Sequence, residues 1–243
     1  MRTFISRSEQ GCEFTSQAGL PVSGRLAPGA LVSERVQARM VERLREHGVR
    51  DARVLAAMAK VPRHAFLDAA LASRAYEDTA LPIGCGQTIS RPYVVALTAE
   101  LALKDCPQPQ QSKLLEVGTG CGYAAAVMAQ LFGTVVSIER LRALHEAARL
   151  HLRPLRIANL RLVFGDGMEG LPAEAPFDVI AAAAAGESLP AAWLDQLKPG
   201  GRIVAPVGGV EQQLTVFGKD ASGVTWRRHV SPVRFVPLRA GRS

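Results

Sequence analysis

Short apolar runs alternate with segments of helical periodicity between residues 114 and 205, and this alternation limits the fold more than any other feature of the chain. The candidate strands are Leu114–Val117, Val135–Ile138, Leu160–Phe164, Val179–Ala182 and Arg202–Ala205. The helical segments between them are Tyr123–Leu131, Leu141–Leu152 and Ala191–Leu197. Parallel strands need long crossover connections, which helices usually supply. The pattern therefore predicts an α/β fold with a mostly parallel, Rossmann-like sheet and helices on both faces.

The segments on either side of this core follow different patterns. From Ser33 to Leu103 the spacing predicts helices, the second of them capped by Asp51, with a third helical piece over Phe66–Tyr76. A glycine-rich polar stretch, 82–92, interrupts this helical cap. After Pro206 the pattern predicts a β-hairpin at the sheet edge, with strands Leu214–Phe217 and Val224–Val230.

These patterns predict one domain over residues 33–243, preceded by a leader. The domain comprises a helical cap with its glycine-rich loop (33–108), a core (109–206) and C-terminal edge strands (207–243). Residues 1–32 are rich in Ser, Gly, Gln and Pro, so we expect a disordered or loosely attached leader.

Apolar length and cysteine spacing exclude several classes of protein. The longest purely apolar run, Val179–Ala185, has seven residues, whereas a membrane span needs about 20. Without a signal-like stretch at the start, we expect a cytoplasmic protein. The four cysteines, none in a CxxC pair, predict reduced thiols and no metal site.

The net charge of +7 is concentrated near the end of the sequence. Residues 226–243 contain five arginines and no acid, which leaves +2 for the other 225 residues. A basic segment of this kind keeps open a nucleic-acid partner.

A glycine loop follows the first strand of the core. The sequence LLEVGTGCGY places Gly118, Gly120 and Gly122 between a strand and a helix, where backbone can approach a ligand closely. The dinucleotide fingerprint requires glycine where Tyr123 stands, so that cofactor class is disfavoured. Glu139 and Asp166 follow the next two strands, and the carboxyl ends of parallel strands share one edge. We therefore expect a ligand site at this edge.

The loop and the acids resemble those of class I S-adenosylmethionine-dependent methyltransferases. The resemblance implies that an acid after the second strand takes the ribose hydroxyls and that an acid after the third lies near adenine. The cofactor-binding residues predicted in this way are Ile83, Glu116, Gly118, Thr119, Gly120, Gly122, Glu139, Arg140, Asp166 and Gly167.

A second set of motifs narrows the resemblance. The chain contains VPRHAF (61–66), a Tyr-x-Asp element (76–78), PIGCGQTISRPY (82–93), LKPGGR (197–202) and VRFVPL (233–238). From about residue 33 to about 239 the chain resembles the protein-L-isoaspartate O-methyltransferases, and PIGCGQTISRPY is specific to that family. The resemblance implies methyl transfer to the free α-carboxylate of L-isoaspartyl residues in damaged proteins and peptides, followed by repair through a succinimide.

The resemblance also implies a substrate side for the site. Ser90 is the implied active-site residue, where its hydroxyl would orient the substrate carboxylate, and Thr88 would assist it. Residues Val233, Phe235, Val236 and Pro237 would bind the peptide, with VRFVPL as an extended edge to which it adds a strand. A carboxylate is already ionised at neutral pH, so no general base is required. We expect the five histidines to be surface or packing residues.

Two alternatives remain open at this point. The basic end of the sequence would suit a methyltransferase that acts on nucleic acid. The run Ala181–Ala185 stands where the family usually carries a threonine, which would suit a cofactor-binding protein without catalysis. The resemblance favours isoaspartyl peptides and proteins as partners of a monomer, with S-adenosyl-L-methionine as cofactor, no metal, no membrane and no stable nucleic-acid partner.

Overall fold

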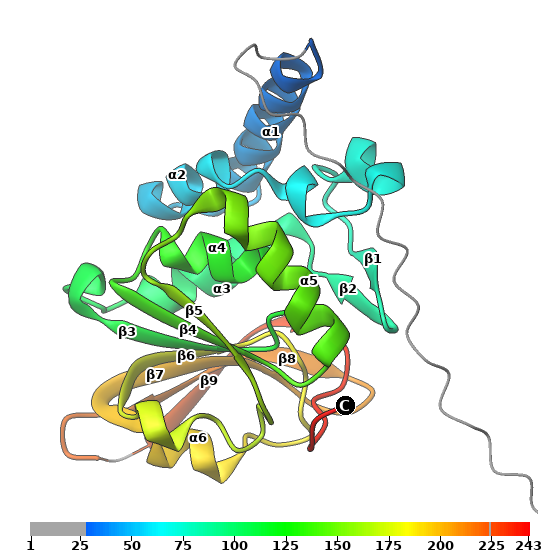
Figure 1. Cartoon of the computed structure of the whole chain (residues 1–243). Coiled ribbons are helices and arrows are strands. Elements are labelled where there is room, and N and C mark those ends of the chain that lie inside the picture. Colours follow the sequence, from blue (N-terminus) through cyan, green and yellow to red (C-terminus); the bar gives the residue numbers. More distant parts are fainter. Residues whose placement is uncertain (1–27, 224) are drawn as a thin grey trace, which may run out of the picture.

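A computed structural model describes residues 28–223 and 225–243. Within these residues, seven strands form one sheet in the order β5-β4-β3-β6-β7-β8-β9 (Figure 1). The strands are β3 (Lys113–Val117), β4 (Thr134–Glu139), β5 (Leu160–Phe164), β6 (Phe177–Ala182), β7 (Leu197–Val207), β8 (Gln212–Lys219) and β9 (Thr225–Val233). The first five run parallel, and β8 and β9 add an antiparallel hairpin to β7. The predicted parallel core and C-terminal hairpin are therefore confirmed.

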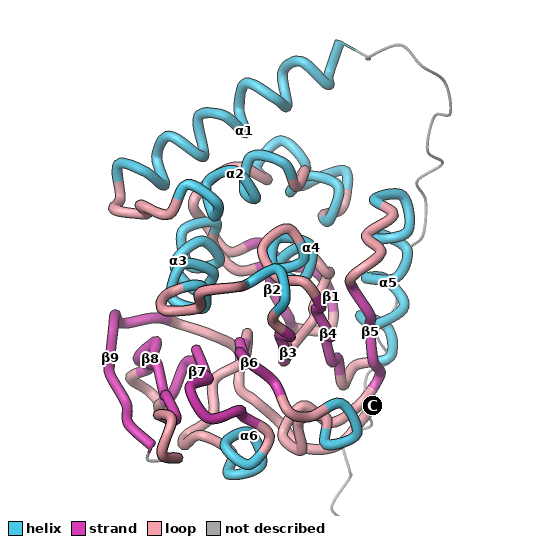
Figure 2. The backbone as a smooth tube through the Cα atoms, turned by 90° about the vertical axis from the view of Figure 1, so that its left-hand side faces the viewer, coloured by secondary structure: helices cyan, strands magenta, loops and turns pink. Residues whose placement is uncertain are grey.

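Alternate residues of the central strands enter two separate hydrophobic layers. Leu114 of β3 belongs to the layer beneath α3 (Pro92–Leu103) and α4 (Tyr123–Ala129), whereas its neighbour Leu115 packs with Trp193 of α6 (Ala191–Asp195). Both leucines are fully buried. Figure 2 shows the sheet between α3 and α4 on one side and α6 on the other. The predicted covering of both faces is thus confirmed, and the strand order reverses between β3 and β6, where ligands usually bind.

The helices of the N-terminal cap pack on the hydrophobic layer that contains Leu114. Helix α1 spans Pro28–Glu46 and α2 spans Ala52–Lys60. Asp51 caps α2, since its side chain accepts a hydrogen bond from the Arg53 amide. Helix α1 begins five residues before the predicted boundary at Ser33, and the rest of the predicted leader lies outside the described residues.

Two predictions for the cap are wrong. The segment expected to form one helix over Phe66–Tyr76 contains two short 3-10 helices, η1 (Arg63–Phe66) and η2 (Ala69–Arg74). The glycine-rich stretch, expected to form a loop, instead contains a separate antiparallel hairpin, β1 (Leu81–Gly84) with β2 (Gln87–Ile89). The hairpin turns at Gly84, Cys85 and Gly86, all of which have positive φ.

The remaining elements connect the strands. Helix α5 (Arg142–Leu152) links β4 to β5, and three further 3-10 turns are η3 (Pro109–Gln111), η4 (Arg153–Leu155) and η5 (Pro172–Glu174). No helix of the described chain is long and apolar enough to cross a membrane. Cys106 and Cys121 are free thiols, and Cys12 lies outside the described residues.

Candidate functional site

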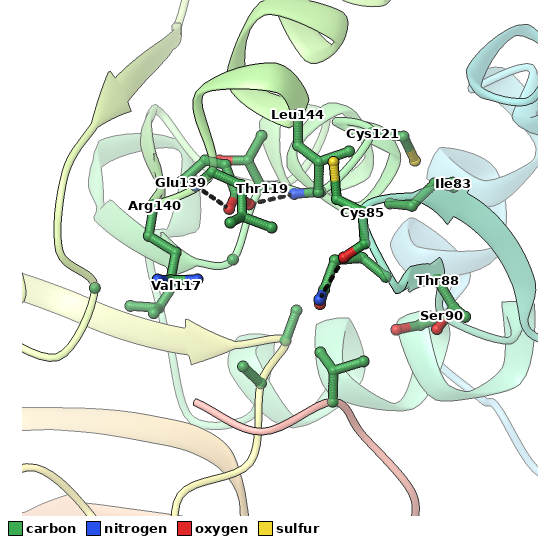
Figure 3. A pocket seen from close by; sticks show the side chains of 18 of the residues that line it. Ile83, Cys85, Thr88, Ser90, Val117, Thr119, Cys121, Glu139, Arg140 and Leu144 are labelled. Carbon is green, nitrogen blue, oxygen red and sulfur yellow. Dashed lines mark hydrogen bonds between the residues drawn. The ribbon is translucent and has the colours of Figure 1, made fainter. Parts of the chain in front are cut away.

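A cavity of about 560 Å³ lies at the carboxyl ends of β3 and β4. Its walls come from the β1–β2 hairpin, the glycine loop, the end of β4 and the segment around Val236 (Figure 3). The predicted site residues that line it are Ile83, Thr88, Ser90, Gly118, Thr119, Gly120, Glu139, Arg140, Gly167, Val236 and Pro237. Cofactor-side and substrate-side predictions therefore meet in a single space.

The glycine loop takes a shape that side chains would prevent. Gly118, Gly120 and Gly122 all have positive φ, at 94°, 55° and 94°, a region that residues with a Cβ rarely adopt. A Cβ on Gly122 would also approach Leu152 to 2.9 Å. The loop therefore lies against α5 and presents backbone to the cavity, although Gly122 itself does not line it.

Glu139 ends β4 with its carboxylate fixed against the cavity wall. The side chain is 6% exposed, and its Oε2 accepts a hydrogen bond from the Gly120 amide at 2.9 Å. Its Oε1 accepts one from the Leu141 amide at 2.9 Å (Figure 3). Each carboxylate oxygen has a second lone pair, so this carboxylate can also accept hydrogen bonds from a diol in the cavity.

Glu116 lies beneath the loop and does not line the cavity. It is 2% exposed, and Ser137 donates a hydrogen bond to its Oε2 at 2.5 Å. Burial raises the pKa of this carboxyl to about 8, against the opposing effect of the Ser137 hydroxyl and with a smaller contribution from the charge of Glu139. Glu116 instead lines a small hollow of about 30 Å³ next to the cavity, away from the position that a direct cofactor contact requires.

Asp166 follows β5 but binds the chain's own backbone. Its Oδ1 accepts a hydrogen bond from the Met168 amide at 2.8 Å, and its Oδ2 accepts one from the Gly241 amide at 2.5 Å. Arg140 donates to the Gly241 carbonyl oxygen at 3.0 Å. Asp166 does not line the cavity, whereas Ser243 does. The segment 239–243 thus lies along the cavity rim and is held there by Asp166 and Arg140.

The β1–β2 hairpin brings two hydroxyl groups to the cavity. Thr88 and Ser90 are two residues apart and lie on the same side of the chain (Figure 3). Ser90 lines both the cavity and the small hollow. Asp78, three residues before β1, joins the segment leading into the hairpin to the start of α3, because its Oδ1 accepts a hydrogen bond from the Tyr93 amide at 2.9 Å. Ser90 is therefore placed where the two spaces meet.

The segment after β9 uses most of its own backbone groups. Ala185 donates to the Val236 carbonyl oxygen at 2.8 Å and accepts from the Leu238 amide at 2.7 Å. The Gln212 side chain both donates to and accepts from the backbone of Phe235, at 3.1 and 2.6 Å. Pro237 has no amide hydrogen. Val236 and Pro237 line the cavity, but Phe235 lines only the small hollow and Val233 lines neither.

Some lining residues were not predicted from the sequence. They include Leu141, Leu144, Ala183, Ala184 and Ser243. Ala183 and Ala184 belong to the alanine run, so the missing threonine was a signal that this strand end faces the site; Ser243 has no local signal. None of the five histidines, all of which are described, lines the cavity.

The cavity fits a nucleoside-containing cofactor. Its volume is in the range of small-molecule pockets, and a Cβ on Gly120 would come within 3.2 Å of Ile83, so the loop and the hairpin approach closely on either side of the space. Glu139 supplies the acceptor for a ribose diol. Within the described residues, no group of His, Cys, Asp and Glu side chains could hold a metal ion.

Comparisons with known proteins identify relatives over almost the whole chain. Residues 34–243 match the family described as protein-L-isoaspartate(D-aspartate) O-methyltransferase. A protein-L-isoaspartate O-methyltransferase of Methylibium petroleiphilum is 56% identical over 93% of this chain and 82% of its own length. Its counterpart in Bordetella parapertussis is 54% identical over 87% of this chain and 81% of its own length.

Solved structures agree with the sequence comparison. A protein-L-isoaspartate O-methyltransferase superposes with a TM-score of 0.75 at 30% identity, over 84% of this chain and 66% of that chain. A Plasmodium falciparum protein, described as a putative member of the same enzyme group in complex with S-adenosyl-L-homocysteine, superposes with a TM-score of 0.72. It is 24% identical over 84% of this chain and 98% of that chain, and it supports the fold alone.

Proposed function

Since the chain belongs to the protein-L-isoaspartate(D-aspartate) O-methyltransferase family, we propose that it transfers a methyl group from S-adenosyl-L-methionine to the free α-carboxylate of L-isoaspartyl residues. The methyl ester then closes to a succinimide and so begins repair of damaged proteins and peptides. The observation that carries this proposal is the position of Ser90, which the family-specific hairpin brings into one cavity with the glycine loop and Glu139.

The cofactor side of the cavity is formed by the backbone of the glycine loop and the carboxylate of Glu139. Two backbone amides already fix that carboxylate, so little side-chain order is lost when it accepts the ribose hydroxyls. Bound S-adenosyl-L-methionine supplies a methyl group on a positively charged sulfur. The chain's contribution is to hold the acceptor carboxylate in line with that methyl group and away from water.

The acceptor carboxylate needs positioning and no deprotonation. A free α-carboxyl group has a pKa of roughly 3.3–3.7 and is ionised at neutral pH. This agrees with a cavity that no histidine lines. Ser90 donates its hydroxyl hydrogen to one carboxylate oxygen, so that the other oxygen faces the methyl group, and Thr88 supports the same anion from the same side of β2.

The setting in which the enzyme acts is part of the same proposal. We expect a cytoplasmic monomer whose partners are isoaspartyl peptides and proteins, with no stable nucleic-acid partner. The family's described activity on protein supports this choice. A methyltransferase for nucleic acid would instead transfer label to RNA or DNA.

Methyl transfer to matched peptides tests the proposal. Labelled S-adenosyl-L-methionine is offered with an isoaspartyl peptide and with its aspartyl counterpart, and a base-labile methyl ester is expected on the isoaspartyl peptide alone. Cofactor binding without transfer would favour a protein that lacks catalysis and would contradict the proposal.

A variant tests the role of Ser90. Ser90→Ala removes one hydrogen bond to a charged group, which lowers kcat by about 10- to 100-fold. The matched control is Ser222→Ala, which removes a hydroxyl that donates to Asp220 in the β8–β9 turn, and this variant keeps full activity. Full activity of Ser90→Ala would rule out its positioning role.

A further inference from the structure

Strand β9 lies at one end of the sheet. Within the described residues it pairs only with β8, and no strand covers its outer edge. Its residues from Thr225 to Val230 are all exposed, including the large side chains Trp226 at 44% and Val230 at 36%. Exposed edge strands present unpaired amide and carbonyl groups to which another extended chain can add.

The edge is also strongly basic. Arg227 and Arg228 lie on β9, Arg234 follows it, and residues 221–243 include no acid. The ion pairs formed within residues 28–223 and 225–243 involve none of these three arginines. Their charge is therefore available to an acidic partner.

The direction of β9 connects this edge to the cavity. The strand ends at Val233, and two residues later Phe235 lines the small hollow together with Ser90, while Val236 lines the cavity itself. At about 3.4 Å per residue, Arg228 lies about 24 Å of extended chain before Phe235. A peptide whose damaged residue occupies the cavity can thus reach the β9 edge.

The segment immediately after β9 is poorly suited to add a strand. The Gln212 side chain hydrogen-bonds to the backbone N–H and carbonyl of Phe235. The backbone of Ala185 hydrogen-bonds to the Val236 carbonyl and the Leu238 amide, and Pro237 has no amide hydrogen to donate. On β9 itself Pro232 cannot donate either. The stretch available for pairing is therefore Thr225–Ser231.

We propose that the outer edge of β9, over Thr225–Ser231, docks an acidic, extended segment of the polypeptide substrate several residues away from the isoaspartyl residue. This inference rests on the proposed function, and it extends recognition from the damaged residue to its distant flank. Backbone pairing aligns the segment, and Arg227 and Arg228 select acidic side chains on its two faces.

Peptides of equal composition test the position of the acidic block. One isoaspartyl peptide carries four glutamates about six to nine residues from the damaged residue, and a second carries them immediately beside it. The first is expected to show a kcat/KM about 3- to 10-fold higher at low salt, with the difference lost at high salt because the exposed charges are screened. Equal kcat/KM for the two peptides at low salt would overturn the proposal.

Matched variants assign the effect to β9. The double variant Arg227→Gln, Arg228→Gln is expected to abolish the preference for the distant acidic block, whereas Arg35→Gln, Arg39→Gln on α1 removes the same charge and preserves it. A neutral isoaspartyl peptide is methylated equally by all three proteins, which separates failure of docking from failure of the proposed function. A preference that survives in the β9 variant would refute the assignment.

N-methylated peptides test backbone pairing. Methyl groups on alternate amides of the distant acidic block prevent strand addition while leaving its charge unchanged. Two such peptides, methylated in the two alternating registers, cover either orientation, and at least one is expected to lose the gain in kcat/KM. If both retained the full gain, charge alone would attract the peptide and strand addition would be wrong.

Discussion

Glu116 gives the fold a pH-dependent weakness that one substitution removes. Its carboxyl is fully buried without a cation, and its pKa rises from 4.5 to about 8. Because the folded protein holds this carboxyl in its protonated form, the free energy of unfolding is highest below pH 4.5. It falls as the pH rises from 4.5 to about 8, where the unfolded chain ionises Glu116 freely and the folded protein does not. At about 1.36 kcal/mol per pKa unit, this shift corresponds to a loss of about 5 kcal/mol across the window.

Glu116→Gln replaces the protonated carboxyl by an amide of nearly the same shape that still accepts the Ser137 hydrogen bond. We expect the variant and the parent to unfold with similar free energies near pH 4.5. The variant then becomes more stable relative to the parent by roughly 1.4 kcal/mol per pH unit up to about pH 8.

Urea unfolding of the cofactor-free protein at intervals from pH 4.5 to 8.5 measures this difference. Glu174→Gln is the control. Hydrogen bonding from Lys113 lowers the pKa of the half-buried Glu174, so its contribution is lost only as the pH falls below about 4.5, and the difference between this variant and the parent stays nearly constant over the measured range. A constant difference between Glu116→Gln and the parent across the range would refute the reasoning, since Glu116 would then ionise in the fold as it does in the unfolded chain.

Two further variants test how the cavity walls are supported. Gly122→Ala introduces a Cβ at a positive φ of 94°, where it would lie 2.9 Å from Leu152. We expect the free energy of unfolding to fall by about 2–4 kcal/mol and the cofactor to bind more weakly. The control Gly209→Ala has open space around the new Cβ and should unfold like the parent. Trp193→Phe removes the 2.8 Å hydrogen bond to the Gly167 carbonyl oxygen. We expect it to lower the free energy of unfolding by about 1–3 kcal/mol and to raise the Kd for S-adenosyl-L-homocysteine, measured by calorimetry. The control Trp226→Phe should change neither quantity. An unchanged Kd for Trp193→Phe would show that Gly167 is held in place without it.

The parallel core was predictable because its central strands are buried on both faces. Runs such as Val135–Ile138 and Val179–Ala182 are therefore almost entirely apolar, and the structure places β4 and β6 there. The hairpin at 81–89 was missed because its first short strand contains Pro82 and Gly84, residue types that are depleted in strands. The turn at Gly84–Gly86 sets the pairing of these two strands, and the spacing of apolar residues does not predict such a turn.

The sequence did not predict which side chains hydrogen-bond to residues far away along the chain. Glu139 and Asp166 stand at equivalent strand ends, yet Glu139 faces the cavity while Asp166 accepts a hydrogen bond from Gly241, 75 residues away. The burial of Glu116 likewise follows from the helices that cover β3. The family resemblance supplied Ser90, but only the fold shows that it lies between two spaces.

The walls of the cavity come from widely separated parts of the chain, and this has a consequence for how the protein is made. The β1–β2 hairpin is synthesised before the glycine loop, and Val236 and Pro237 are added only after the whole parallel core. A ribosome-bound chain that has passed residue 206 already carries the whole parallel core but lacks one wall of the site. Binding competence is therefore acquired only after the segment around Val236 has been added, and a chain terminated before it would contain the glycine loop without a closed site around it.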